Sequence, residues 1–271
     1  MKIYISVDME GICGIVNWDC TSESGYDYHR ARSLMTGEVN AAIRGALKAG
    51  ASEVIVNDSH NKMTNIVIED LHPEAVLISG YPKLNSMMEG LDDTFDGVLL
   101  IGYHSRINTR GVLNHTYSSR SVYNLKINGT DIGEFGLNCY IAGHYNVPVL
   151  MATGDDQLTC EAEAMVTGIQ AVTVKKARGR YSALCMHPER ACALIEEAAQ
   201  SAIQNKDRML PVKAVEPVHM EVTLMNSGMA DEAEIMPGIE RTGANTVAYT
   251  APDVITAYRA FRTITALACS V

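Results

Sequence analysis

The segment "KIYISVD" (2–8) decides the fold, because it is a short and almost continuous apolar run. Such a run predicts a strand that is buried on both faces of a sheet. Similar runs recur at 53–58, 75–80, 97–104, 147–156 and 171–179. Amphipathic segments separate several of them, most clearly at 28–50, where Gly50 marks the expected end of a helix. This alternation predicts an α/β fold: a mostly parallel sheet flanked by helices in a Rossmann-like, three-layer arrangement.

The alternation changes in two places. Residues 121–133 alternate in polarity on both sides of Asn128-Gly129, a pattern that predicts a β-hairpin. After residue 179 the strands and helices follow one another less regularly, with helices expected near 188–205 and 228–235 and after Pro252. We therefore predict a larger α/β domain over residues 1–180 and a smaller C-terminal, two-layer α/β domain over residues 181–271.

Composition narrows the class of protein. The chain has 271 residues, is 47% hydrophobic and carries a formal net charge of -10, which disfavours nucleic acid and anionic membranes as partners. The seven cysteines are odd in number and form no C-x-x-C pair, which indicates reduced thiols rather than a disulfide framework. The first apolar run is too short for a signal peptide, and no apolar stretch approaches the ~18 residues of a membrane span. We expect a soluble, cytoplasmic protein.

Polar residues with metal-binding chemistry follow three of the predicted strands. Asp8 and Glu10 follow the first strand, His60 follows the second, and His104 follows the strand at 97–104. In open parallel sheets, bound molecules and ions lie at the carboxyl ends of the strands. These four side chains are therefore expected to meet at one edge of the sheet. Carboxylates and imidazoles without thiolates suit Zn²⁺ or another first-row divalent ion in a hydrolytic site.

Simpler interpretations exist for each residue alone. Asp8 could cap a turn, Glu10 could be a surface acid, and either histidine could be an ordinary loop or strand-end residue. "DMEG" (8–11) also resembles the opening of a Mg²⁺-dependent, haloacid-dehalogenase-like phosphatase, with Asp8 as nucleophile. The remaining roles in that scheme would go to Ser59, Lys62, Asp155 and Asp156. It leaves His60 and His104 without a role, and joint placement at strand ends favours the metal site.

A set of ordered motifs makes the hypothesis more specific. It comprises "SVDMEG" (6–11), "VNDSHNKM" (56–63), "LISG" (77–80), "EGLDDTFDG" (89–97), "GYHS" (102–105), "GEFGLN" (133–138), "PVLMATGDD" (148–156) and "MPG" (236–238). Together they resemble the DppA-type zinc D-aminopeptidases, densely up to about residue 160 and more thinly beyond. The segment 17–28 contains no motif of that family.

The resemblance implies a site with two zinc ions per subunit. Asp8 would bridge both ions, Glu10 and His104 would complete one set of ligands, and His60 and Glu134 would complete the other. Glu134 is not found by the strand-end argument. His115, in the loop after the fourth strand, would be the catalytic histidine. Gly11 gives the backbone room to turn away from the two acids.

The implied activity is hydrolysis of the N-terminal peptide bond of short peptides, with a D-residue such as D-alanine at the N-terminus. The implied assembly is a homodecamer of two stacked pentamers. An aminopeptidase for L-peptides and a catalytically silent peptide- or metal-binding protein remain as alternatives, because stereochemical preference depends on pocket shape rather than on ligand motifs.

Overall fold

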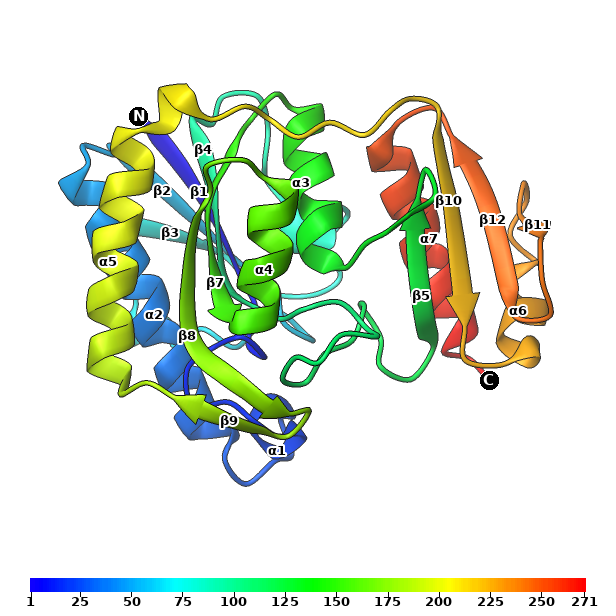
Figure 1. Cartoon of the computed structure of the whole chain (residues 1–271), viewed down its shortest axis with the longest axis horizontal. Helices are drawn as coiled ribbons and strands as arrows, with labels where there is room; N and C mark the ends of the chain where they lie inside the picture. Colours follow the sequence, from blue (N-terminus) through cyan, green and yellow to red (C-terminus); the bar gives the residue numbers. More distant parts are fainter.

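The computed structural model covers residues 1–271 and contains two β-sheets that lie side by side (Figure 1). The larger sheet has seven strands in the order β3-β2-β1-β4-β7-β8-β9. All its pairings are parallel except the last, between β8 and β9. The bounds of these strands are β1 (Lys2–Val7), β2 (Glu53–Asp58), β3 (Ala75–Ile78), β4 (Gly97–Tyr103), β7 (Val149–Asp155), β8 (Gln170–Gly179) and β9 (Ser182–Cys185).

Helices cover both faces of the larger sheet, which confirms the predicted three-layer α/β class. On one face α2 (Tyr28–Lys48) packs against α5 (Pro188–Gln204), and on the other lie α3 (Glu134–His144) and α4 (Asp156–Met165) (Figure 1). Successive strand residues point to opposite faces, so Tyr4 belongs to one hydrophobic cluster and its neighbours Ile3 and Ile5 to the other.

The smaller sheet is antiparallel and has the order β11-β12-β10-β5-β6. Its strands are β5 (Val122–Ile127), β6 (Thr130–Asp131), β10 (Val218–Leu224), β11 (Glu240–Arg241) and β12 (Thr246–Ala251), with helices α6 (Ser227–Ala233) and α7 (Val254–Ala268). The predicted hairpin is present as β5 and β6: Asn128 and Gly129 both have positive φ, 50° and 81°, as a tight hairpin turn requires. Helix α7 packs against α3, which joins the two sheets in one hydrophobic cluster.

The division between the two sheets differs from the boundary predicted at residue 180. The hairpin β5-β6 lies within the predicted first domain but pairs with β10 of the smaller sheet. Strand β9 and helix α5 lie beyond residue 180 but belong to the larger sheet and its helical layer. Sequence order misplaces them because the chain enters the smaller sheet, returns to the larger one, and then leaves again.

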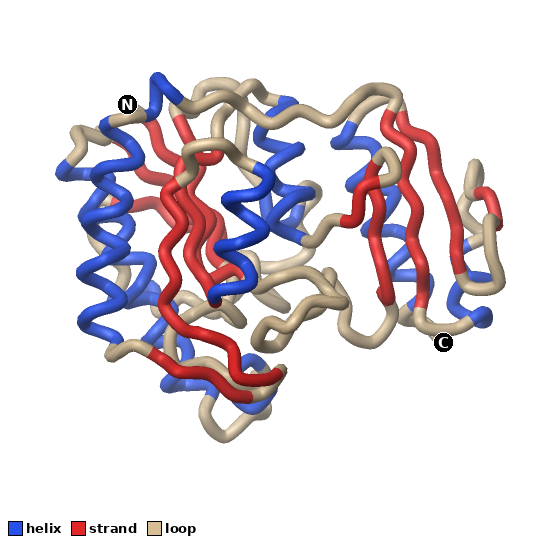
Figure 2. The backbone as a smooth tube through the Cα atoms, in the orientation of Figure 1, coloured by secondary structure: helices blue, strands red, loops and turns tan.

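The remaining short elements connect these layers. They are the helix α1 (Trp18–Thr21) and the 3₁₀ turns η1 (Ile68–Asp70), η2 (Ser86–Met88) and η3 (Lys206–Arg208). The loops that follow β1, β2 and β4 all leave the same edge of the larger sheet, because these strands are parallel (Figure 2). No helix is both long and apolar enough to cross a membrane.

Candidate metal and active site

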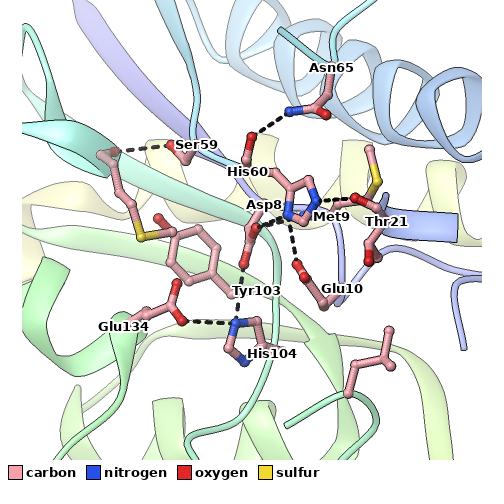
Figure 3. A network of polar contacts seen from close by, with 12 residues as sticks. Asp8, Met9, Glu10, Thr21, Ser59, His60, Asn65, Tyr103, His104 and Glu134 are labelled. Carbon is pink, nitrogen blue, oxygen red and sulfur yellow. Dashed lines mark hydrogen bonds and ion pairs between the residues drawn. The ribbon is translucent and has the colours of Figure 1, made fainter. Parts of the chain in front are cut away.

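The four ligands predicted from strand ends meet at the carboxyl edge of the larger sheet (Figure 3). Their side chains are all buried. His60 Nδ1 lies 3.3 Å from Asp8 Oδ1 and 3.1 Å from Glu10 Oε2. His104 Nε2 lies 3.5 Å from Asp8 Oδ2. Asp8 therefore stands between the two imidazoles, each of which approaches a different carboxylate oxygen.

Glu134 and His115 join the same cluster from the other side. Glu134 begins α3, where its Oε1 lies 3.1 Å from His104 Nε2 and accepts a 2.6 Å hydrogen bond from Tyr117 N. The His115 ring stacks on the His104 ring at a centroid distance of 3.9 Å, and its Nε2 lies 3.8 Å from Glu134 Oε1. All six residues predicted for the site thus form one continuous cluster.

The outer hydrogen bonds of the imidazoles fix which nitrogen faces the cluster. His60 Nε2 donates to Thr21 O at 2.8 Å, so Nδ1 is left for the carboxylates. His104 Nδ1 donates to Ser105 O at 3.0 Å and His115 Nδ1 donates to Leu113 O at 2.9 Å, which leaves Nε2 inward in both rings. Metal-binding histidines are commonly oriented in this way, by a carbonyl that accepts from the other ring nitrogen.

Two groups of three ligand atoms lie close enough to surround an ion. Asp8, Glu10 and His104 offer atoms within 4.8 Å of one another, and His104, His115 and Glu134 do the same. The first group contains the set that the family resemblance implies for one ion. The shortest histidine–glutamate contacts, however, join residues of different implied sets: His60 lies 3.1 Å from Glu10, and His104 lies 3.1 Å from Glu134.

Several of these atoms are buried without a hydrogen-bond partner. They are Asp8 Oδ2, Glu10 Oε2 and His104 Nε2. A buried polar atom without a partner is costly, and here three converge with matching N/O ligand chemistry. With neutral imidazoles the carboxylates of Asp8, Glu10 and Glu134 carry three negative charges. The site therefore fits divalent metal ions, which remove both the unpaired atoms and the excess charge.

The pKa shifts of the site residues have the same excess of negative charge as their cause. Burial, reinforced by the Glu10 carboxylate, raises the pKa of Asp8 to about 7. Burial alone would lower the pKa of His104, but the nearby Glu134 carboxylate outweighs it and raises that pKa to about 10. Burial and the charge of His104 lower the pKa of His115. The carboxylates thus raise the pKa of His60 and His104 and favour binding of positive charge, whether proton or metal ion, at these two imidazoles.

A buried ammonium group supports the loop that carries two of the ligands. Lys175, in β8, donates to the carbonyls of Glu10, Ile12 and Ile15, the last two at 2.9 and 2.6 Å. The opposite face of this loop packs closely on β4: Gly11 N donates to Gly102 O at 2.7 Å, and a Cβ on Gly11 would overlap the carbonyl of Tyr103. Gly11 is therefore needed for a close approach of two backbones, rather than for a positive φ.

A second buried lysine supports the loop that carries His60. Lys83 donates to Asn57 Oδ1 and Asp58 O, both at 2.7 Å, and to Ile78 O at 3.1 Å. The Asp58 carboxylate accepts hydrogen bonds from Asn65 and from Ile66 N, which closes the loop around His60. Each of the two loops that carry ligands is thus held by hydrogen bonds from one buried lysine.

Sequence reasoning missed several residues around the site. Trp18 meets the His115 ring edge-on at 5.7 Å, and Thr21 holds His60, although their segment shows no family motif. Arg180, at the turn between β8 and β9, reaches Asn114 next to His115. The sequence could have indicated a buried role for Lys175, because it is a charged residue inside an apolar strand. For Trp18 and Arg180 the sequence gives no such indication.

The residues required by the phosphatase alternative do not assemble around Asp8. Both carboxylate oxygens of Asp155 accept backbone hydrogen bonds, from the start of α4 and from Val112 N. Asp156 accepts from Ala177 N, and Lys62 pairs with Glu23 at the surface. Asp155 and Asp156 are therefore structural, and the structure does not favour that alternative.

The chain is similar to known proteins in sequence and in fold. The model of the peptidase family M55, described as D-aminopeptidase, matches residues 1–263. The chain belongs to this family. A D-aminopeptidase of Bacillus subtilis (strain 168) is 44% identical over 271 residues, which cover 99% of this chain and 98% of the relative.

The fold is also similar to that of a solved structure. The solved structure of a Zn-dependent D-aminopeptidase DppA from Bacillus subtilis, described as a self-compartmentalizing protease, superposes with a TM-score of 0.98. The match has 43% sequence identity and covers 100% of this chain and 99% of that one. The resemblance drawn from the ordered motifs, the α/β class and the assignment to D-aminopeptidases are all confirmed.

Proposed function

We propose that this chain is a dinuclear zinc aminopeptidase that removes one N-terminal residue, with D-alanine preferred, from short peptides. The observation that carries the proposal is the buried cluster of Asp8, Glu10, His60, His104 and Glu134, in which three ligand atoms have no other partner. The zinc dependence of the DppA relative supports the choice of metal. With neutral imidazoles, one divalent ion would leave the buried cluster with a net charge of −1, and two would leave it with +1, which one hydroxide would cancel.

Asp8 is the residue best placed to be shared by two ions. Its Oδ1 faces His60 and its Oδ2 faces His104, so its two oxygens point into different halves of the cluster. Glu10 and His104 would complete one set of ligands, and His60 and Glu134 the other. When bound, zinc supplies an activated water and polarises the scissile carbonyl.

His115 would move the proton of the reaction. Its Nδ1–H donates to Leu113 O, so in the neutral ring Nε2 is the unprotonated nitrogen, and it faces the cluster. Nε2 would accept the proton of the attacking water and return it to the leaving amine, as general acid–base catalysis requires. Stacking on His104 and the edge of Trp18 fix the plane of the ring. The free amino terminus of the peptide would bind near the metal ligands and a carboxylate of the cluster.

The assembly is proposed from the relative. A self-compartmentalizing protease encloses its active sites within its own oligomer, and that description belongs to the DppA structure. We propose that this chain likewise forms a homo-oligomer, a decamer of two pentamers, in the cytoplasm. Size-exclusion chromatography with light scattering would give a mass near ten times 29.4 kDa.

A peptide panel tests the proposed activity. D-Ala-D-Ala, D-Ala-L-Ala, L-Ala-D-Ala and L-Ala-L-Ala are incubated with the zinc-loaded protein, and released alanine is resolved by chirality. The proposal predicts free D-alanine from the two peptides with an N-terminal D-residue and little from the others. Equal or greater release from L-Ala-L-Ala would instead support an aminopeptidase for L-peptides, and release from none would contradict both.

A further inference from the structure

The turn between β8 and β9 brings a cation to the rim of the site. Arg180 lies at this turn, and its guanidinium donates from Nη2 to Asn114 O at 3.1 Å, one residue before His115. The backbone is docked as well, because Leu113 N donates to Arg180 O at 2.8 Å. The position of the guanidinium relative to the catalytic loop is therefore set by two hydrogen bonds.

Aromatic rings flank the same guanidinium. Its Cζ lies 5.9 Å from the centroid of the Trp18 ring and 5.6 Å from that of Tyr181. Trp18 in turn contacts His115 at 5.7 Å, so Arg180 is connected to the catalytic histidine through one ring. Stacking of this kind orients the planar group and leaves its remaining N–H donors free for an incoming acceptor.

Arg180 has no acidic partner, unlike four other arginines of the chain. Arg30, Arg44, Arg106 and Arg241 each pair with a carboxylate, whereas the guanidinium of Arg180 forms no ion pair. Its side chain is exposed, and so a ligand in solution can reach it. A positive, preoriented and unpaired group beside a catalytic loop suits an anionic part of the substrate, and a planar carboxylate fits its fork of donors.

We propose that Arg180 binds the C-terminal carboxylate of the peptide substrate. This inference rests on the proposed aminopeptidase function, in which the amino terminus lies at the metal-binding cluster and the chain extends past His115. A peptide spans roughly 3.3–3.6 Å per residue, so the carboxylate of a dipeptide or tripeptide lies roughly 7–10 Å from its amino group. The Trp18 ring lies 5.7 Å from the His115 ring and 5.9 Å from the Arg180 guanidinium, so His115 and Arg180 are at most about 12 Å apart, which is the scale of a short peptide. The site would therefore favour short peptides with a free C-terminus over capped ones.

The test compares D-Ala-D-Ala with its C-terminal amide, using the full-length, zinc-loaded protein. The measured quantity is the ratio of kcat/KM for the acid to that for the amide. The wild type is expected to favour the acid about tenfold, through KM, and Arg180→Gln is expected to bring the ratio close to one. Arg178→Gln removes an equal charge from the same exposed hairpin and should leave the ratio unchanged. Arg180→Lys should restore part of the preference.

Two results would overturn the inference while leaving the enzyme assignment intact. One is a wild-type ratio near one. The other is an Arg180→Gln protein that loses activity on acid and amide equally, which would mean that the arginine only supports the catalytic loop. A wild-type protein that releases D-alanine from neither substrate contradicts the proposed function itself, so the two failures are distinguishable.

Discussion

Replacing Lys175 with methionine tests how far the active site depends on a residue that binds neither metal nor substrate. Methionine keeps the length and the apolar stem of the side chain but removes the ammonium group. The carbonyls of Glu10, Ile12 and Ile15 then lose their donor in a buried position. Each unpaired buried acceptor costs about 1–3 kcal/mol, whereas loss of the buried charge recovers part of that sum.

The expected net effect is about 3 kcal/mol of lost stability, which for a chain of this size lowers Tm by roughly 6–12 °C. The local effect is more specific, because the loop that carries Asp8 and Glu10 is released from β8. Outer-shell partners of metal ligands typically contribute about 10–100-fold to metal affinity, so zinc affinity should fall by that amount. Competition with a chromophoric chelator measures the zinc Kd, and thermal unfolding of the same samples measures the loss of stability.

The neighbouring Lys176 provides the matched control, because it is exposed on the same strand. Lys176→Met should leave both zinc Kd and Tm within error of the wild type. A folded Lys175→Met protein that binds zinc with wild-type affinity would refute the reasoning, since the lysine would then support only the fold. Should Lys175→Met fail to fold, Lys175→Gln removes the charge but retains two N–H donors, and it allows the same comparison.

Three further predictions concern the catalytic histidine, a buried acid and the loop glycine. His115→Ala should keep its zinc but lose at least a hundredfold in kcat, whereas exposed His29→Ala should change neither; loss of zinc from His115→Ala would make His115 a ligand instead. Burial raises the pKa of Glu38 from 4.5 to about 7, so the folded state binds more protons between these values and stability falls as pH rises through this window. Glu38→Gln should remove this pH dependence of the free energy of unfolding and raise that free energy by up to about 3 kcal/mol at pH 8. Urea unfolding at pH 5 and pH 8 measures both effects. An unchanged pH dependence would exclude Glu38 as its source. Gly11→Ala should separate the loop from β4, and measured zinc affinity and Tm should both fall; wild-type values would contradict the backbone contact seen at Tyr103.

Strand positions and strand ends were the parts of the fold most accessible from sequence. The near-continuous apolar runs predicted the parallel strands, and the positions after β1, β2 and β4 predicted Asp8, Glu10, His60 and His104 as neighbours. The structure brings these four together as expected. The reason is general: the carboxyl ends of parallel strands lie at one edge of the sheet, so polar residues in the loops that follow them become neighbours.

Residues that reach the site from helices and distant loops could not be predicted by that route. Glu134 enters from the start of α3 and was identified only through resemblance to a family. Trp18 and Arg180 come from segments whose local sequence gives no sign of proximity to His115, because only the packed fold brings them together. The division between the sheets does not follow the predicted boundary at residue 180, for a related reason. The hairpin at Asn128-Gly129 was recognised, but its pairing with β10, almost a hundred residues later, has no local signature.

Zinc stoichiometry of the wild type and of Asp8→Ala tests the central claim most directly. Purified, zinc-loaded proteins are dialysed against metal-free buffer, and zinc per chain is measured by elemental analysis beside protein quantified by amino-acid analysis. Asp93→Ala serves as the control, because Asp93 is an exposed acid. The account predicts two zinc ions per chain in the wild type and in Asp93→Ala, and fewer than one in Asp8→Ala. An Asp8→Ala protein that still holds two ions, or a wild-type protein that holds none, would contradict a metal centre built around Asp8.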